Sequence, residues 1–223
     1  MRFVAFETST EWCSVALWLD GEIAAIEERA GNRHSELLLP MLERLLNQEK
    51  ITANQLDALA FGAGPGSFTG LRIACGVAQG IALARGIPVI GISTLEAMAE
   101  ESGAARVVAC LDARMREVYY SAHERIDGKP GGRWREVIPA QCVAPAAVRL
   151  PPGDGWTGCG NGFDAYGSFG LANVIANIHP SAVAVARLAA PRLAQGGGVD
   201  AALAAPAYLR DKVAFTAAER AAK

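Results

Sequence analysis

The sequence has few of the residues that build metal centres and disulfide frameworks. Among its 223 residues are only three histidines and five cysteines. The cysteines are odd in number, widely spaced and never arranged as C-x-x-C, which favours reduced, buried thiols in a cytoplasmic protein. The histidines, at positions 34, 123 and 179, have no ligand-like spacing, so we expect no metal site.

The sequence also lacks an excess of charge and a long apolar run. The net charge of −2 gives no overall electrostatic footprint for a nucleic acid, and a solvated hairpin face explains the small basic cluster Arg133-Trp134-Arg135. The longest apolar stretch, at 73–84, is shorter than the roughly 20 residues that a bilayer requires. Glu7 comes too early for a signal peptide, so we expect a cytoplasmic protein without a membrane partner.

The apolar patterns predict two similar groups of elements. The first group comprises strands at 3–6, 13–19 and 22–28, a helix at 32–47, a strand at 58–62, a helix ending near 84, a strand at 87–92 and a helix from 93 or 94. The second group comprises strands at 107–111, 117–123, 133–138 and 156–159 and a helix at 181–195. Asp20-Gly21 predicts a tight hairpin between the second and third strands.

This order of elements predicts an α/β fold with two lobes. In each group, antiparallel connections are followed by crossovers, which predicts a mixed sheet with helices on its faces. We place the first lobe at residues 1–104, a smaller second lobe at 105–198, and a C-terminal segment that returns to the first lobe at 199–223. Three strands in a row at the start of both lobes indicate a duplicated fold.

The densest local signal is the glycine-rich run from Gly62 to Arg72, between a predicted strand and a predicted helix. Such a turn presents backbone N–H groups at the helix N-terminus, where a phosphate or carboxylate can dock. Glycine, proline and serine also build ordinary strand-to-helix turns, with Ser67 as the helix cap. The residues of this turn leave both interpretations open.

Several segments together resemble the bacterial TsaB family. The matching segments are 6–10, 32–38, 64–72, 91–95, 112–115 and 208–213, and the most specific of them reads Gly-Pro-Gly-Ser-Phe-Thr-Gly-Leu-Arg. The resemblance covers most of the chain and is strongest up to about residue 120. Proteins of this family are partners of the TsaD enzyme in making threonylcarbamoyladenosine in tRNA.

The resemblance implies an actin-like, sugar-kinase-like (ASKHA) fold with duplicated RNase-H-like lobes and mixed sheets. It also implies a scaffold that is not an enzyme on its own but a subunit of a threonylcarbamoyl transferase complex. The implied partners are a TsaD-like catalytic paralogue and a TsaE-like ATPase, with a homodimer when the paralogue is absent and only indirect contact with tRNA. TsaD-like proteins bind metal through two histidines in the pattern H-x-x-x-H. In this chain His34 occupies the first position, but the second position is Leu38. The resemblance therefore implies no metal ligands and no catalytic residues.

The first predicted strand ends in a turn that actin-like ATPases use for phosphates. Glu7, Thr8, Ser9 and Thr10 occupy that place, and most family members have aspartate where this chain has Glu7. We predict a vestigial phosphate turn, with no firm cofactor but possible ATP or ADP at the interface with the partner. Capping hydroxyls in a plain turn are the alternative. For the whole chain, the alternatives are a self-sufficient ATP-binding kinase-like enzyme and a homodimeric binding module.

The helices on either side of the glycine-rich run predict an interface. The second helix has pairs of small residues four apart, Ala74 with Ala78 and Gly76 with Gly80, and it is apolar nearly all round, so both faces should be buried. The predicted two-helix surface consists of His34, Leu38, Met41, Leu71, Ala74, Cys75 and Ala78. Packing within one chain is the alternative, and the pairing of TsaB with TsaD that the resemblance implies favours the interface.

Overall fold

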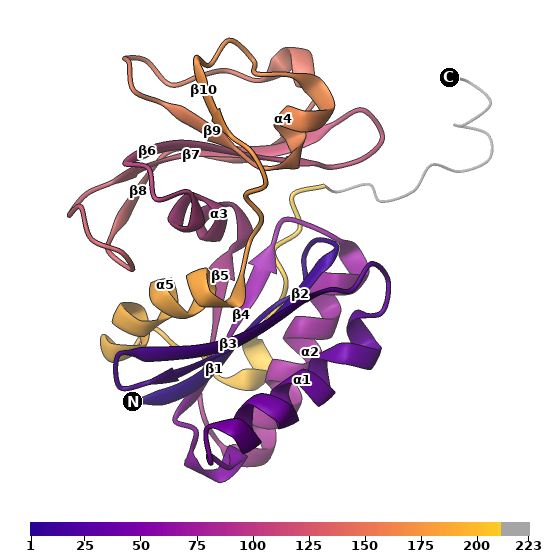
Figure 1. Ribbon diagram of the computed structural model, residues 1–223, viewed down its shortest axis with the longest axis vertical. Helices are drawn as coiled ribbons and strands as arrows, with labels where there is room; N and C mark the ends of the chain where they lie inside the picture. Colours follow the sequence, from indigo (N-terminus) through magenta and orange to yellow (C-terminus); the bar gives the residue numbers. More distant parts are fainter. Residues whose placement is uncertain (211–223) are drawn as a thin grey trace.

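Two five-stranded sheets form the two lobes of the molecule, in a computed structural model that describes residues 1–210 (Figure 1). The first sheet contains β1 (Arg2–Glu7), β2 (Trp12–Leu19), β3 (Glu22–Arg29), β4 (Ala58–Gly64) and β5 (Val89–Ser93). The second sheet contains β6 (Arg106–Asp112), β7 (Val118–Arg125), β8 (Trp134–Val143), β9 (Thr157–Cys159) and β10 (Asn173–Ile175).

The two sheets have the same strand order. It is β3-β2-β1-β4-β5 in the first and β8-β7-β6-β9-β10 in the second, with three antiparallel strands followed by two parallel ones. The predicted α/β class, mixed sheets and duplication are therefore confirmed. The hairpin turn at Asp20-Gly21 has the positive φ angles, 51° and 115°, that a tight two-residue turn requires.

The helices divide unevenly between the lobes. They are α1 (His34–Gln48), α2 (Phe68–Arg85), α3 (Thr94–Ser102), α4 (Asn161–Tyr166) and α5 (Ala182–Ala194), with short 3-10 turns η1 (Ala53–Gln55), η2 (Pro145–Ala147) and η3 (Ala201–Leu203). The short elements α4 and β10 were not among those predicted. No helix within residues 1–210 combines the length and the apolar character needed to cross a membrane.

The two lobes exchange helices across their junction. In β1, Val4 and Phe6 pack toward α1 and α2, whereas Phe3 and Ala5 pack toward α5. Helix α5 follows β10 in the chain but covers the first sheet, and α3 follows β5 but packs its Leu95 on the second sheet. Both helices therefore lie between the sheets (Figure 1).

Residues 199–210 run back along the first lobe, and we call them the C-terminal strap. Val199 pairs with Val89 of β5, and the N–H of Ala207 donates to the carbonyl of Ala63 at the end of β4, with an N···O distance of 2.7 Å. The strap ends at Arg210, beside the second lobe. The remainder of the predicted 199–223 segment lies outside the described residues.

Candidate functional site

A cleft of about 490 Å³ lies where the two lobes meet. It is bordered by the first hairpin turn of each lobe, the β1–β2 turn (residues 8–11) and the β6–β7 turn (residues 113–117), together with the start of α2 and the end of the strap. Lining side chains include Thr10, Glu11, Phe68, Arg114, Met115 and Arg210. Because the lobes share one topology, the two turns are equivalent positions of the duplicated fold.

The acidic residue at the end of β1 does not reach this cleft. The Glu7 side chain is 1% exposed, and burial raises the pKa of its carboxyl. Its Oε1 accepts a hydrogen bond from the Ser9 N–H at 2.6 Å, whereas its Oε2 has no partner within the described part of the chain. A Cβ on Gly62 of β4 would lie 1.8 Å from that Oε2, so this glycine makes room for the buried carboxyl.

The hydroxyl residues after Glu7 pack against the glycine-rich run. The Thr8 hydroxyl donates to the Gly70 carbonyl at 2.7 Å, and the Ser9 carbonyl accepts from the Ser67 N–H at 2.7 Å. A Cβ on Gly70 would lie 1.9 Å from the Thr8 carbonyl oxygen, which only glycine avoids. Glycine at this position therefore lets the run approach the turn, as the structural interpretation of the run requires.

Part of the predicted phosphate turn is buried, and part of it reaches the cleft. Glu7, Thr8 and Ser9 are buried, and of the four predicted residues both Ser9 and Thr10 line the cleft. At the start of α2, Ser67 caps the helix by accepting from the Gly70 N–H. The strap covers the other end of the run, since a Cβ on Gly64 would lie 2.8 Å from the Ala207 carbonyl oxygen. The phosphate turn therefore stays a prediction, which the burial of Glu7 and Thr8 disfavours.

The seven residues predicted to form the interface lie in the core of the first lobe. None of them is more than 5% exposed, namely His34, Leu38, Met41, Leu71, Ala74, Cys75 and Ala78. Ala74 and Ala78 face inward, where their small side chains allow α2 to pack closely on the sheet. The His34 ring is also engaged within the chain, with its Nε2 3.2 Å from the Trp12 carbonyl oxygen. These side chains form no surface in the single chain, which corrects the prediction.

The other pair of small residues on α2 points outward. Gly76 and Gly80 are exposed, and a Cβ built on either would meet nothing within 4 Å. Leu39 of α1 and Leu83 of α2 are 52% and 59% exposed, and Ile73 and Val77 are partly buried. We call this surface the outer face and define it by Leu39, Ile73, Gly76, Val77, Gly80 and Leu83. Between Arg72 and Arg85, α2 contains no charged residue.

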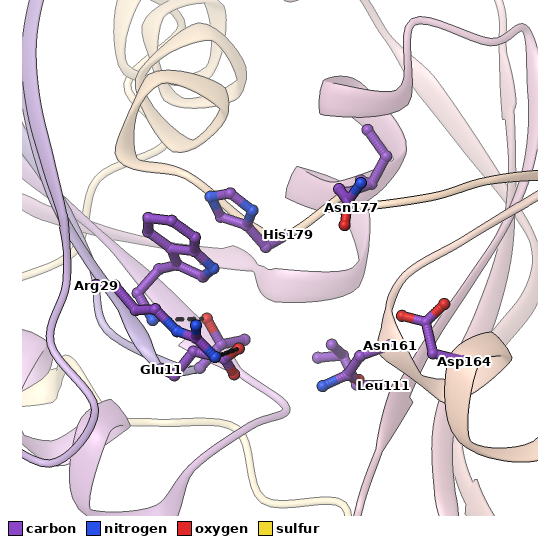
Figure 2. A pocket seen from close by; sticks show the side chains of 10 residues that line it. Glu11, Arg29, Leu111, Asn161, Asp164, Asn177 and His179 are labelled. Carbon is purple, nitrogen blue, oxygen red and sulfur yellow. Dashed lines mark hydrogen bonds and ion pairs between the residues drawn. The ribbon is translucent and has the colours of Figure 1, made fainter.

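A second cavity, of about 350 Å³, adjoins the cleft (Figure 2). Glu11 and Arg29 of the first lobe form an ion pair at 3.6 Å on one side, and Asn161 and Asp164 line the other side. His179 stacks on Trp12 with ring centres 4.4 Å apart, and its Nε2 lies 3.0 Å from Glu27.

The hydrogen bond to Glu27 raises the pKa of His179. The contacts of His179 tie the segment between β10 and α5 to the first lobe. Sequence reasoning missed them, because the partners of His179 come from β2 and β3, at the opposite end of the chain. Within residues 1–210, no group of three or more histidine, cysteine or carboxylate side chains converges in a way that could hold a metal ion.

Two lobes with one strand order, joined by exchanged helices and meeting at a cleft between their first hairpin turns, define an actin-like, sugar-kinase-like protein of duplicated RNase-H-like lobes. The chain is 39% identical to the tRNA threonylcarbamoyladenosine biosynthesis protein TsaB of Haemophilus influenzae over 226 residues, 96% of each chain. With TsaB of Escherichia coli it shares 37% identity over 96% of this chain and 97% of that one. The chain belongs to the TsaB family.

Two further comparisons agree with this assignment. The family model described as "TsaD: tRNA N6-adenosine threonylcarbamoyltransferase" matches residues 26–218. The solved structure of YeaZ from Pseudomonas aeruginosa superposes with a TM-score of 0.86 at 37% identity, covering 93% of this chain and 99% of that chain. The fold and the family are therefore supported along nearly the whole chain.

Proposed function

We propose that this chain is a noncatalytic partner subunit for formation of the threonylcarbamoyl group on adenosine in tRNA. Its full-length relatives are named as proteins of tRNA threonylcarbamoyladenosine biosynthesis. The proposal places the chain in the cytoplasm with its tRNA, as the partner of a TsaD-like catalytic paralogue. A TsaE-like ATPase completes the assembly.

The observation that carries this proposal is the pair of glycines on the outer face. A glycine inside a helix destabilises it by roughly 0.5–1 kcal/mol relative to alanine. Neither Gly76 nor Gly80 has a positive φ, and no atom among residues 1–210 lies close enough to require glycine at either position. Small residues four apart do, however, allow a second helix to approach closely.

The apolar side chains around these glycines extend the same surface. Leu83 is largely exposed, while Ile73 and Val77 are half-buried beside α1. Helices from another chain that pack here would bury all three and would fill the flat strip along Gly76 and Gly80. In the proposal this occupant is the helix pair of the TsaD-like paralogue, and a second copy of this chain takes its place when the paralogue is absent.

The noncatalytic role is supported by how the first lobe uses its own polar groups. The Glu7 carboxyl and the Thr8 hydroxyl are buried and bonded inside the lobe, and the His34 ring contacts the Trp12 carbonyl. We therefore propose that ATP or ADP, when the assembly binds it, lies at the interface with the partner and not at the turn after β1.

Reconstitution tests the proposal. The TsaD-like paralogue, the TsaE-like ATPase, threonylcarbamoyl-adenylate and tRNA are combined with and without this chain. We expect modified tRNA only when the chain is present, and none from the chain alone. The variant Gly76→Gln/Gly80→Gln should remain folded and fail to support the reaction. Equal activity without the chain, or activity of the chain by itself, would overturn the proposal.

A further inference from the structure

The β6–β7 turn has a strained backbone. Arg114, Met115 and Arg116 all have positive φ, at 62°, 56° and 60°. That region is unfavourable for residues with side chains, and three in succession without a glycine are unusual. Strained backbone persists only where the surroundings hold it in place, and it gathers at functional sites.

Several hydrogen bonds hold this turn. The Arg114 N–H donates to Asp112 Oδ1 at 2.9 Å, and the Glu117 N–H donates to the Arg114 carbonyl at 3.1 Å. From the strap, Arg210 Nη2 donates to the Ala113 carbonyl at 3.0 Å and also binds the Glu117 carboxylate. The last described residue of the chain therefore fixes the conformation of a turn in the other lobe.

The fixed turn displays two cations at the edge of the cleft. The Arg114 side chain is 87% exposed, Arg116 is exposed, and Met115 between them is half-exposed. The nearby carboxylates are largely occupied, because Asp112 accepts from the turn itself and Glu117 binds Arg210. Asp112 also forms an ion pair with Arg114 at 3.6 Å, so the turn presents two exposed arginines beside one mostly buried carboxylate, and its charge toward solvent is positive on balance.

The chain contains a second Arg-x-Arg sequence that behaves differently. Arg133 and Arg135 flank Trp134 as Arg114 and Arg116 flank Met115. Arg135 forms an ion pair with Glu124, and the Trp134 indole N–H donates to the buried Glu100 carboxylate at 3.0 Å. That cluster is engaged within the second lobe, whereas Arg114 pairs with Asp112 next to its own turn and is more exposed than Arg135, at 87% against 65%.

An aromatic platform lies beside the displayed turn. The Arg72 guanidinium lies 3.5 Å from the centre of the Phe68 ring, and its Nε donates to the Tyr208 hydroxyl at 2.9 Å. Phe68 also borders the cleft together with Arg114. Exposed aromatic rings and guanidinium planes are the surfaces on which unpaired RNA bases stack.

We propose that this patch, made of Arg114, Arg116, Arg72, Phe68 and Tyr208, binds the tRNA directly, whereas the family resemblance implied only indirect contact. The two turn arginines contact phosphates and the aromatic platform contacts an unpaired base. This inference rests on the proposed function, which supplies the tRNA. Exposed cations beside stacking surfaces favour RNA as the ligand. An acidic protein surface would pair with the cations but would provide no bases to stack on the platform. The net charge of −2 gives no sign of this positive patch. Its residues are far apart in the sequence and come together only in the folded chain.

The test measures tRNA binding by the complex of this chain with the TsaD-like paralogue over a series of salt concentrations, by fluorescence anisotropy. The variant Arg114→Asn/Arg116→Asn removes both charges, and asparagine tolerates positive φ better than most residues. We expect the slope of log affinity against log salt to fall by about 2, and affinity near 0.1 M salt to fall on the order of tenfold or more. Arg133→Asn/Arg135→Thr is the matched control and should leave both quantities unchanged.

Light scattering on the same samples separates this proposal from the proposed function. If no complex forms with the paralogue, the proposed function is wrong, and anisotropy with the isolated chain and the same variants still tests the patch. Unchanged salt dependence in the turn variant would overturn the inference. Loss of pairing with the paralogue or the ATPase in place of tRNA affinity would also overturn it, since the patch would then be a protein-binding surface.

Discussion

The two hairpin turns that meet at the cleft are equivalent in the duplicated fold, yet they are built in opposite ways. At the start of the β1–β2 turn, the Glu7 carboxyl and the Thr8 hydroxyl pack inward, against glycines that make room for them, while Thr10 and Glu11 line the cleft. The β6–β7 turn adopts a strained backbone and exposes its side chains. The first turn thus has an unstrained backbone and a partly buried set of side chains, whereas the second has a strained backbone and three exposed side chains in succession.

The outer layers of the lobes differ as well. The first sheet is covered by the long helices α1 and α2, whereas the corresponding connections of the second lobe contain only η2 and the short helix α4. Duplication has preserved strand order while each copy has acquired a separate surface. The first lobe offers an apolar helical face, and the second offers a charged turn.

The largest expected effect separates the inner and outer sides of α2. Ala78→Arg should lower the free energy of unfolding by more than about 4 kcal/mol, because it overfills the core and buries an unpaired charge. Gly80→Arg, on the outer face, should leave the chain folded but abolish pairing with the paralogue. Urea unfolding and light scattering measure the two results. If the Ala78→Arg chain folds and the Gly80→Arg chain still pairs with the paralogue, the assignment of the inner and outer sides of α2 is wrong.

A second test concerns the β1–β2 turn of the first lobe. Gly70→Ala should destabilise the chain by roughly 1–3 kcal/mol, because the new Cβ meets the Thr8 carbonyl oxygen. The control Gly76→Ala, in the same helix, should stabilise the isolated chain by roughly 0.5–1 kcal/mol. Both are measured by urea unfolding, and equal effects of the two substitutions would contradict the close approach at Gly70.

The carboxyl groups that end β1 and β6 allow a comparison by pH. Burial raises the pKa of Glu7 above its ordinary value of 4.5, so the folded state holds the proton more tightly than the unfolded state. The stability from that proton is complete below pH 4.5 and is lost as the pH rises through the raised pKa. Glu7→Gln should therefore stabilise the chain at pH 7 by about 1–2 kcal/mol, since it removes the negative charge from a buried site.

The advantage of the Glu7→Gln variant should shrink as the pH falls toward 4.5. The matched substitution in the other lobe, Asp112→Asn, should destabilise the chain, because it removes the charge that strengthens the bonds from the Arg114 N–H and the Tyr166 hydroxyl and that pairs with the Arg114 guanidinium. Thermal melts between pH 4.5 and 8 measure both variants. A Glu7→Gln variant that is less stable than the parent at pH 7 would mean that the carboxylate has a partner.

The smallest expected effect concerns backbone strain. Met115→Gly should stabilise the chain by about 0.5–1 kcal/mol. This is the free energy gained when the strain of a positive φ is relieved, minus the entropic cost of ordering the more flexible glycine on folding. Ser9→Gly, in the unstrained turn of the first lobe, should destabilise it by a similar amount. Thermal melts measure both variants. A Met115→Gly chain that is less stable than the parent would mean that the backbone at position 115 is not strained.

The elements that could be predicted from the sequence were those with a long local pattern. Alternating strands joined by Asp20-Gly21, and the three-strand opening of each lobe, are confirmed. Helix α4, with six residues, and strand β10, with three, are too short for a period to be visible. The family was equally accessible, because the specific glycine-rich run is contiguous in the sequence.

The orientation of side chains could not be predicted in the same way. Helix α2 is apolar nearly all round, so its periodicity does not decide between the Ala74 side and the Gly76 side. The direction of the Glu7 carboxyl depends on the space left by Gly62, which belongs to another strand. The patch around Arg114 contains residues from α2, the β6–β7 turn and the strap. The sequence of any one of these segments does not predict that it lies beside the other two.

Because the lobes exchange α3 and α5, neither half of the chain can complete its core alone. The two halves should therefore depend on each other for folding when they are produced as separate fragments. A break between residues 104 and 105 would yield one piece carrying α3 without the second sheet, and another carrying α5 without the first. Each piece alone would expose the apolar side of a helix, including Met98 in one and Leu188 in the other. Co-expressed, the two pieces hold reciprocal halves of both cores and should reassemble as a split protein.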